Sequence, residues 1–484
     1  MPGEKTDGQG EHEEDSALPS LGDHSDPFDF PGAPVTLQAV DFSINAQNSS
    51  GQLIRYVDIV HLHRSRRGLA ISTRRRAFYI RRDNFSDPAA MRRLEEDLRE
   101  RVSVLADGPE HLARMAEIDQ LAARRRPKMA VYGFALLCLS AYVVQTSDEF
   151  FTSVGAFAPS LVAMGEYWRL ITANFLHNML LFPFHIGLNL FCVLIFGFVT
   201  ERVLGSLRTV VVMGVSGITA MLAAGAMGYP EVVGASGVAA GLAGALVSIE
   251  LGGGSGLPGW WRIPRILVFA AVVLQVVFDA FLPFVAGAAH VGGFVAGYFT
   301  ARVMLEDALH RRALGLITQG LAFGLLAMLL FSVVETVPLL KRDPQALEFH
   351  GLRRLQSVDG SGYRDNELAW RMLTESDVTL RGAEVALALA ERAADRTGWR
   401  NPDVLDTLAE ALFVVGDRWG ALRVIDRAIA MTGGADYFIQ QRRRFTGERD
   451  ANDRPDPPSA PTRPPGDLPD FDFSEEPGEG PISI

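Results

Sequence analysis

Cysteine is scarce in this sequence: only Cys138 and Cys192 occur among 484 residues, and both lie within apolar runs. Two such residues can supply neither a disulfide framework nor a cysteine-rich metal site. An apolar run near the N-terminus is also lacking, since the first begins near residue 129, too late for a signal peptide. We therefore expect neither a disulfide-stabilised secreted domain nor a cleaved leader.

Net charge is small once the two ends of the chain are set aside. The formal net charge is −11, but residues 1–35 carry nine acidic residues against one Lys, and residues 447–484 carry ten against three Arg. The remainder is mildly basic, near +4. The acidic total therefore identifies no partner, and we expect no nucleic-acid ligand. Both ends lack the apolar content to bury a core, so we predict that they are disordered.

Residues 36–110 predict a small β-rich domain that closes with one helix. Short β-prone runs between residues 53 and 80 are separated by polar turns, and an amphipathic helical pattern follows Asp87. This order resembles a pleckstrin-homology-like domain on the cytoplasmic side, followed by a helical basic linker at 111–128. Its many arginines fit two roles, contact with an anionic lipid leaflet or an ordinary solvated face.

Apolar runs dominate the middle of the chain, and 48% of all residues are hydrophobic. The basic segment at 124–128 precedes the first run, and the later arginine-bearing loops fall on the same side when the runs are counted alternately. We therefore predict a polytopic helical protein of the plasma or bacterial inner membrane, with a cytoplasmic N-terminus and its C-terminal domain outside. Seven runs are near spanning length: 129–146, 184–200, 209–228, 235–250, 265–285, 288–304 and 314–338.

Two polar residues near the starts of apolar runs suggest a reactive pair. Ser236 lies in Gly234-Ala-Ser-Gly237, and His290 lies 54 residues later in Ala-His-Val-Gly-Gly. A serine hydroxyl becomes a useful nucleophile when a base accepts its proton, and histidine is the usual base. The predicted topology puts both residues at the outward ends of helices, hence at the same depth. The alternative interpretation of the surrounding small residues is close helix packing.

His185 and Asn189 are four residues apart, so they share one face of a predicted helix. Beside a nucleophilic serine, such side chains can donate hydrogen bonds to an oxyanion. The alternative is interhelical hydrogen bonding within the bundle. A metal site built from His177, His185 and His290 is disfavoured, because their spacing does not suit it and no acid accompanies them. We expect no cofactor and no metal.

Taken in order, these motifs resemble the rhomboid intramembrane serine proteases over residues 129–305, a six-helix core that the seventh run extends. The resemblance implies a serine–histidine dyad without an aspartate, with Ser236 as nucleophile and His290 as general base. It implies that His185, Asn189 and the Ser236 backbone N–H form the oxyanion hole. Structural roles are implied for Trp168 and Arg169, in a loop of the outer leaflet, and for Glu201, Gly234, Gly237, Gly293 and Gly297.

The chain departs from the family pattern at one position. The family has a Phe-Leu-His whose histidine precedes the oxyanion histidine by five residues, whereas His177 precedes His185 by eight. The spacing between His185 and Asn189 is unaffected. The role of His177 is therefore open, and we expect it to act on stability more than on chemistry.

Residues 341–446, after the seventh span at 306–340, predict a helical repeat domain. Ala386 and Ala393 recur as Ala421 and Ala428, an offset of 35 residues close to that of tetratricopeptide repeats. About two repeats are recognisable, fewer than a stable array usually needs, so we expect a capping segment or docking onto the core. Such repeats bind peptides or partner proteins, and the alternative is a stabilising cap.

Two classes of function follow from these expectations. The first is an intramembrane serine endopeptidase that cleaves single-span membrane proteins near the outer face, where small or helix-destabilising residues let the segment unwind. The presence of both Ser236 and His290 favours it. The alternative is a non-proteolytic membrane adaptor that binds client helices and recruits partners through its flanking domains. A transporter is disfavoured, because no charged pair lies at mid-membrane and no inverted repeat is evident.

Overall fold

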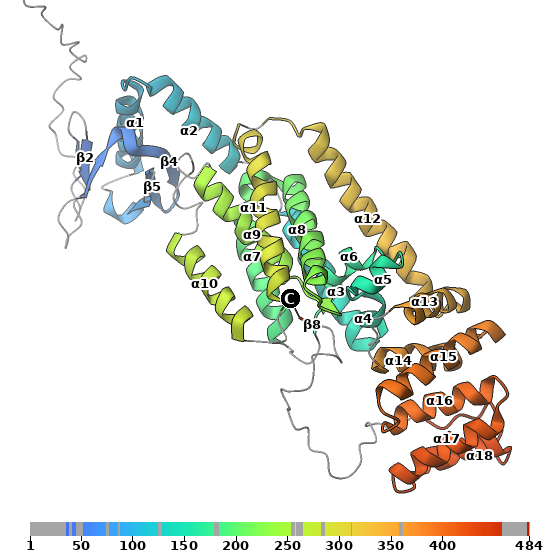
Figure 1. Ribbon diagram of the computed structural model, residues 1–484. Helices are drawn as coiled ribbons and strands as arrows, with labels where there is room; N and C mark the ends of the chain where they lie inside the picture. Colours follow the sequence, from blue (N-terminus) through green and yellow to red (C-terminus); the bar gives the residue numbers. More distant parts are fainter. Residues whose placement is uncertain are drawn as a thin grey trace, which may run out of the picture. The chain divides into compact units, whose positions relative to one another are not determined.

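The chain divides into two compact units, Met1–Arg124 with Gly254–Arg262 and Arg125–Gly253 with Ile263–Ile484. Figure 1 shows the elements of both units, most of which are helical. The predicted N-terminal acidic tail lies outside the described residues, apart from Val35. The computed structural model describes residues 35–37, 41–44, 52–73, 77–85, 88–123, 128–148, 150–178, 183–252, 257, 265–281, 286–310, 312–357, 362–456 and 482–483.

The first unit has two three-stranded antiparallel sheets followed by helices. One sheet holds β1 (Val35–Leu37), β2 (Asp41–Ile44) and β3 (Gln52–Arg55), and the other holds β4 (Ile59–Ser65), β5 (Gly68–Thr73) and β6 (Ala77–Arg81). Helix α1 (Pro88–Ser103) buries one apolar stripe against the second sheet, as its periodicity predicts. That stripe consists of Met91, Leu94, Leu98 and Val102.

The helix predicted as a linker belongs to this N-terminal unit. It is α2 (Gly108–Ala123), and its Met115 and Ile118 are fully buried. The Asp119 carboxylate lies 2.7 Å from Nε2 of the buried His61 on β4. The folded unit therefore continues through α2 instead of ending at residue 110. Part of its positive charge is compensated locally, because Arg64 pairs with Glu95 at 2.6 Å.

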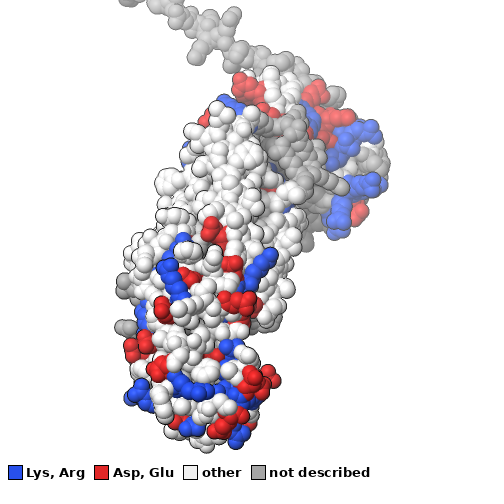
Figure 2. Space-filling view, turned by 90° about the vertical axis from the view of Figure 1, so that its right-hand side faces the viewer, with Lys and Arg blue, Asp and Glu red and all other residues white. Residues whose placement is uncertain are grey.

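All seven predicted apolar runs are helices in the second unit. Four of them, α3 (Met129–Ser147), α7 (Phe184–Leu204), α8 (Ser206–Ala226) and α12 (Leu316–Leu340), are long and apolar enough to cross a membrane. The others are α9 (Ser236–Gly252), α10 (Arg265–Phe281) and α11 (Gly287–Leu309). Figure 2 shows a largely uncharged surface over this part of the molecule, as a lipid-facing bundle requires. The protein is a multi-pass membrane protein.

Glycine lets α9 and α11 pack with their backbones in contact. A Cβ added to Gly293 would lie 2.2 Å from the Gly237 carbonyl oxygen, and one added to Gly297 would lie 2.0 Å from that of Gly241. Any larger residue would push the two helices apart. The small residues around both motifs therefore do serve close helix packing, the alternative considered for them above.

Short helices connect α3 to α7: α4 (Phe150–Gly155), α5 (Pro159–Ala163), α6 (Arg169–Thr172) and the 3-10 turn Ala173–Phe175. This connection lies beside β7 (Val232–Val233), whose Val232 forms a bridge with Phe157. On its other side β7 pairs in parallel with β8 (Ile482–Ser483). Backbone hydrogen bonds between Phe157 and Val232 thus join the connection to the segment that precedes α9.

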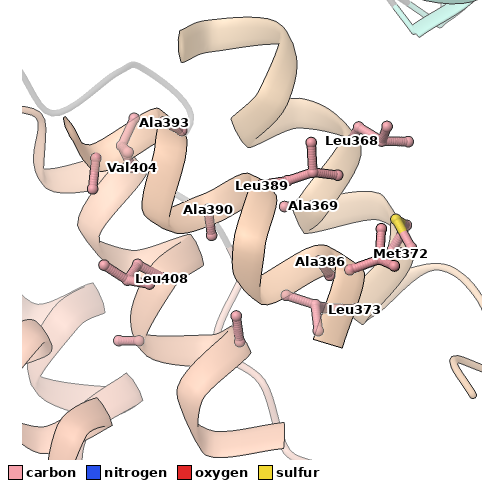
Figure 3. Close-up of a cluster of buried hydrophobic side chains, with 14 of the residues drawn as sticks. Leu368, Ala369, Met372, Leu373, Ala386, Leu389, Ala390, Ala393, Val404 and Leu408 are labelled. Carbon is pink, nitrogen blue, oxygen red and sulfur yellow. The ribbon is translucent and has the colours of Figure 1, made fainter. Parts of the chain in front are cut away.

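Six helices form the C-terminal part of the chain: α13 (Pro344–Gln356), α14 (Gly362–Thr374), α15 (Leu380–Arg396), α16 (Pro402–Val414), α17 (Arg418–Met431) and α18 (Asp436–Thr446). The recurring alanines on α15 and α17 are fully buried (Figure 3 shows two of them, Ala386 and Ala393). Assignment to tetratricopeptide repeats stays a prediction. Arg454 lies 2.8 Å from the buried Glu410, so the ordered chain continues past residue 447, where a disordered tail is predicted to begin.

The C-terminal helices share one hydrophobic core with the α3–α7 connection. Phe150, Val154 and Trp168 of the connection belong to the same buried cluster as Leu368 and Leu389. The C-terminal helices therefore dock onto the core, which is one of the two arrangements expected for a short array. Polar contacts accompany this packing, since the Glu166 carboxylate lies 2.7 Å from His350 Nδ1.

Candidate active site

Ser236 is the first residue of α9, immediately after a tight turn. Gly234 adopts φ +139°, a backbone conformation that residues with a side chain rarely adopt. Its N–H donates to the Ala173 carbonyl at 3.0 Å, which ties the turn to the α3–α7 connection. The Ser236 side chain is half-buried. The serine therefore sits at a helix N-terminus, where free backbone N–H groups favour negative charge.

His290 lies on the first turn of α11 with its ring almost fully buried. Its Nε2 is 2.6 Å from Ser236 Oγ. The close backbone contact between α9 and α11 brings the two side chains within hydrogen-bonding distance across 54 residues of sequence. This is the distance at which a histidine can take the proton of an attacking hydroxyl.

A carboxylate contacts the other nitrogen of the same ring. Asp279 Oδ1 on α10 lies 2.7 Å from His290 Nδ1. Gln275, one turn earlier, donates from Nε2 to the same Asp279 oxygen at 2.7 Å and lies 2.9 Å from His290 Nδ1. The family resemblance implies a pair without an aspartate, and the structure differs in placing one here. Sequence reasoning missed both residues, although an acid and an amide four apart in an apolar run are a signal.

His185 and Asn189 lie on the first turns of α7, which packs against α9. The backbone N–H of Asn178 donates to His185 Nδ1 at 3.0 Å. A neutral His185 accordingly carries its proton on Nε2, which leaves that nitrogen as a donor. Asn189 is buried one helical turn further on. Both side chains thus have the chemistry of hydrogen-bond donors on one face of α7.

His177 is fully buried next to His185, with the two rings edge to face and their centroids 5.1 Å apart. The Gln145 side chain holds its backbone from both sides, accepting from the His177 N–H and donating to its carbonyl, each at 3.0 Å. The three extra residues before His185 therefore do not remove His177 from the site. The His177 ring packs against the ring of His185.

The other motif residues are buried and hold local structure. Arg169 donates to the carbonyls of Ser153 and Ala156 at 2.9 and 2.6 Å, and Trp168 Nε1 donates to Val154 at 3.1 Å. Glu201 accepts from the N–H groups of Ala130 and Val131 at 3.2 and 3.0 Å, which caps the start of α3. Gly237, Gly293 and Gly297 line the contact between α9 and α11.

Comparison with known proteins points to one family. Residues 164–307 match the family model of the Rhomboid domain, a range that contains every motif residue discussed above. The chain is 26% identical over 260 residues to the rhomboid protease GluP of Bacillus subtilis, covering 52% of this chain and 50% of the relative. It is 31% identical over 159 residues to RHOMBOID-like protein 5 of Arabidopsis thaliana, covering 31% and 48%. The chain thus spans about half the length of these curated relatives.

Proposed function

Because residues 164–307 of this multi-pass membrane protein match the Rhomboid domain model, we propose that it is an intramembrane serine endopeptidase. The observation that carries the proposal is the 2.6 Å contact between Ser236 Oγ and His290 Nε2. A buried histidine on a serine hydroxyl at a helix N-terminus is an arrangement suited to acyl transfer.

In the proposed reaction, Ser236 Oγ attacks the carbonyl carbon of a peptide bond while His290 Nε2 takes the hydroxyl proton. Negative charge then develops on the carbonyl oxygen. The Ser236 backbone N–H, His185 Nε2–H and the Asn189 amide are the donors proposed to stabilise it. His290 returns the proton to the leaving amine, and water, activated by the same histidine, hydrolyses the acyl-enzyme.

The proposed substrates are membrane proteins with a single span. A helical segment keeps its carbonyls in internal hydrogen bonds, so it must unwind before Ser236 can attack. Small or helix-destabilising residues near the outer face lower the cost of unwinding. The flanking domains are accessories to this catalytic core.

We propose that the N-terminus is cytoplasmic and that the C-terminal helices lie outside. Arg202 and Arg208 flank the turn between α7 and α8, and Arg208 donates to the Arg312 carbonyl at 3.0 Å, so these arginines gather at one end of the bundle. The positive-inside rule assigns that end to the cytoplasm. A reporter active only outside the cytoplasm, fused after residue 446, should be active, and the same reporter fused after residue 310 should be silent. The reverse pattern would refute this orientation.

The decisive experiment is covalent labelling of the full-length protein in proteoliposomes by a serine-directed fluorophosphonate, followed by cleavage of a model single-span substrate. Ser236→Ala should abolish both labelling and cleavage. Ser248→Ala is the matched control, because Ser248 is a buried serine on the same helix and should leave both intact. Cleavage at the same bond by Ser236→Ala would exclude this mechanism. Absence of labelling and cleavage in the unaltered protein would instead favour the adaptor function.

A further inference from the structure

We propose that Asp279 is a positioning residue for His290, so that the working unit of this chain is Ser236–His290–Asp279 and not a pair. The inference rests on the proposed protease function and extends it. It starts from the 2.7 Å contact between Asp279 Oδ1 and His290 Nδ1, on the side of the ring opposite the serine.

The exposure pattern of α10 shows that this contact is built into the helix. Among the α10 side chains that the structure describes, every one is exposed except a single partly buried stripe, formed by Val268, Val272, Gln275 and Asp279. These positions follow the helical repeat, so they share the face that meets the bundle. Both polar residues in this part of the helix are on that stripe. Burying an ionisable carboxyl group in a membrane helix costs free energy, so such groups usually pair with a partner and mark a functional site. Asp279 has this placement, because its partner is His290.

The hydrogen bonds around Asp279 select one tautomer of His290. Gln275 donates from Nε2 to Asp279 Oδ1, and a carboxylate oxygen accepts but does not donate. His290 Nδ1 must therefore carry the proton in order to bond to Asp279. The neutral ring then has its lone pair on Nε2, 2.6 Å from Ser236 Oγ, where it can accept the hydroxyl proton.

Gln275 offers a competing arrangement that Asp279 suppresses. Its Nε2 lies 2.9 Å from His290 Nδ1, close enough to donate to that nitrogen if the ring were in the other tautomer. In that state Nε2 would carry the proton and could not take one from Ser236. Asp279 also stabilises the imidazolium that forms when His290 takes the proton of the serine, as the buried aspartate of soluble serine proteases does.

Space for Asp279 is provided by a glycine. A Cβ added to Gly287, at the start of α11, would lie 3.0 Å from the Asp279 Cβ and 3.2 Å from its Cγ. The Asp279 side chain thus lies beside the first turn of the helix that carries His290, where a side chain at position 287 would crowd it.

The test compares variants of Asp279 and Gln275 in full-length protein, using both the fluorophosphonate labelling rate and the kcat and KM for a model single-span substrate. Asp279→Asn is almost isosteric, but its amide can donate to Nδ1 and favour the unproductive tautomer. We expect a fall in kcat of about 10²–10⁴-fold with KM nearly unchanged, by analogy with soluble triads. Asp279→Glu should recover part of the loss. Val277→Ala, on the exposed face of the same helix, is the control and should stay within a few-fold of the unaltered protein.

One double variant separates orientation of the ring from general stability. In Asp279→Ala, Gln275 is left to donate to Nδ1 and fix the wrong tautomer. Removing that donor as well, in Asp279→Ala with Gln275→Ala, should raise kcat above that of Asp279→Ala alone. If Asp279 only stabilised the fold, the double variant would have a kcat no higher than that of Asp279→Ala. Asp279→Asn with the labelling rate and kcat of the unaltered protein would overturn the inference while leaving the protease proposal intact, provided that Ser236→Ala is inactive.

Discussion

The Arg364 guanidinium, on the C-terminal helix α14, lies 3.5 Å from the Glu231 carboxylate, five residues before Ser236. The same guanidinium donates to Ser153 Oγ at 2.8 Å in the α3–α7 connection. Arg364 is almost completely buried. It therefore links the C-terminal helices to both segments that flank the turn holding the serine.

The first prediction concerns this link. Arg364→Ala leaves buried partners without their cation, so we expect a loss of stability on the order of 3 kcal/mol and a lower cleavage rate. The measurements are thermal unfolding in detergent and proteolysis of the model substrate. Arg381→Ala is the control on the same domain, because Arg381 is exposed and its ion pair with Glu348 at 3.2 Å is worth little. Equal effects from the two variants would argue against a specific link to the site.

The second prediction tests the packing that positions the site. Gly293→Ala places a Cβ against the Gly237 carbonyl and must separate α9 from α11, and with them Ser236 from His290. A displacement of about 1 Å typically costs about 10²-fold in rate, so labelling and cleavage should fall by at least that much. Gly324→Ala on α12 is the control, since nothing lies within 4 Å of the added Cβ. Undiminished labelling of Gly293→Ala would show that the helix contact does not set the geometry.

Much of the bundle could be predicted from the sequence, because apolar runs of spanning length have few alternatives to helices. The proximity of Ser236 and His290 could be anticipated as well, since charge places them at the same depth and small residues let their helices meet. Both features follow from local composition and from the number of spans, and neither depends on the angle at which two helices cross.

The contacts of Asp279 and Arg364 could not be predicted in the same way. Asp279 reaches His290 only because of how α10 rests against α11, which periodicity does not determine. Arg364 meets Ser153 across 211 residues of sequence, and either residue alone is unremarkable. An acid inside an apolar run was the one available signal for Asp279. Docking of the C-terminal helices depends on the complementary shapes of two surfaces, and no sequence pattern indicates such a match.

A third prediction separates the residues proposed for the oxyanion hole from their support. Asn189→Ala should lower kcat by about 10²–10³-fold, because one donor to the developing charge is lost while the others remain. His177→Ala should chiefly lower the thermal unfolding temperature, since the ring is fully buried against His185 and its removal leaves a cavity. The measurements are kcat in proteoliposomes and the unfolding midpoint of each variant. A loss of kcat in His177→Ala with an unchanged midpoint would instead assign His177 to the chemistry.

The last prediction is a pH dependence of the C-terminal helices. Burial raises the pKa of Asp406 on α16 to about 7, against the opposing hydrogen bonds from Tyr437 Oη at 2.7 Å and Gln441 Nε2 at 3.0 Å. An acid whose pKa is higher in the folded state holds its proton more tightly there than in the unfolded chain. The stabilisation that the protonated Asp406 carboxyl gives to the fold is thus fully present below about pH 4 and is lost as the pH rises to about 7.

Hydrogen exchange of the α16 and α18 amides in the full-length protein should therefore quicken, relative to intrinsic rates, as the pH rises from about 4 to 7. Asp406→Asn cannot ionise, and an amide oxygen at the Oδ2 position still accepts from Tyr437 Oη and from Gln441 Nε2, which lie 2.7 and 3.3 Å from it. The substitution should therefore remove this dependence and protect these helices better at pH 8. Asp426→Asn is the control, because Asp426 is an exposed acid on α17 that pairs with Arg442 at 2.6 Å. If Asp406→Asn exchanged faster than the unaltered protein at pH 8, the buried carboxylate would be stabilising as an anion, and the sign of the argument would be reversed.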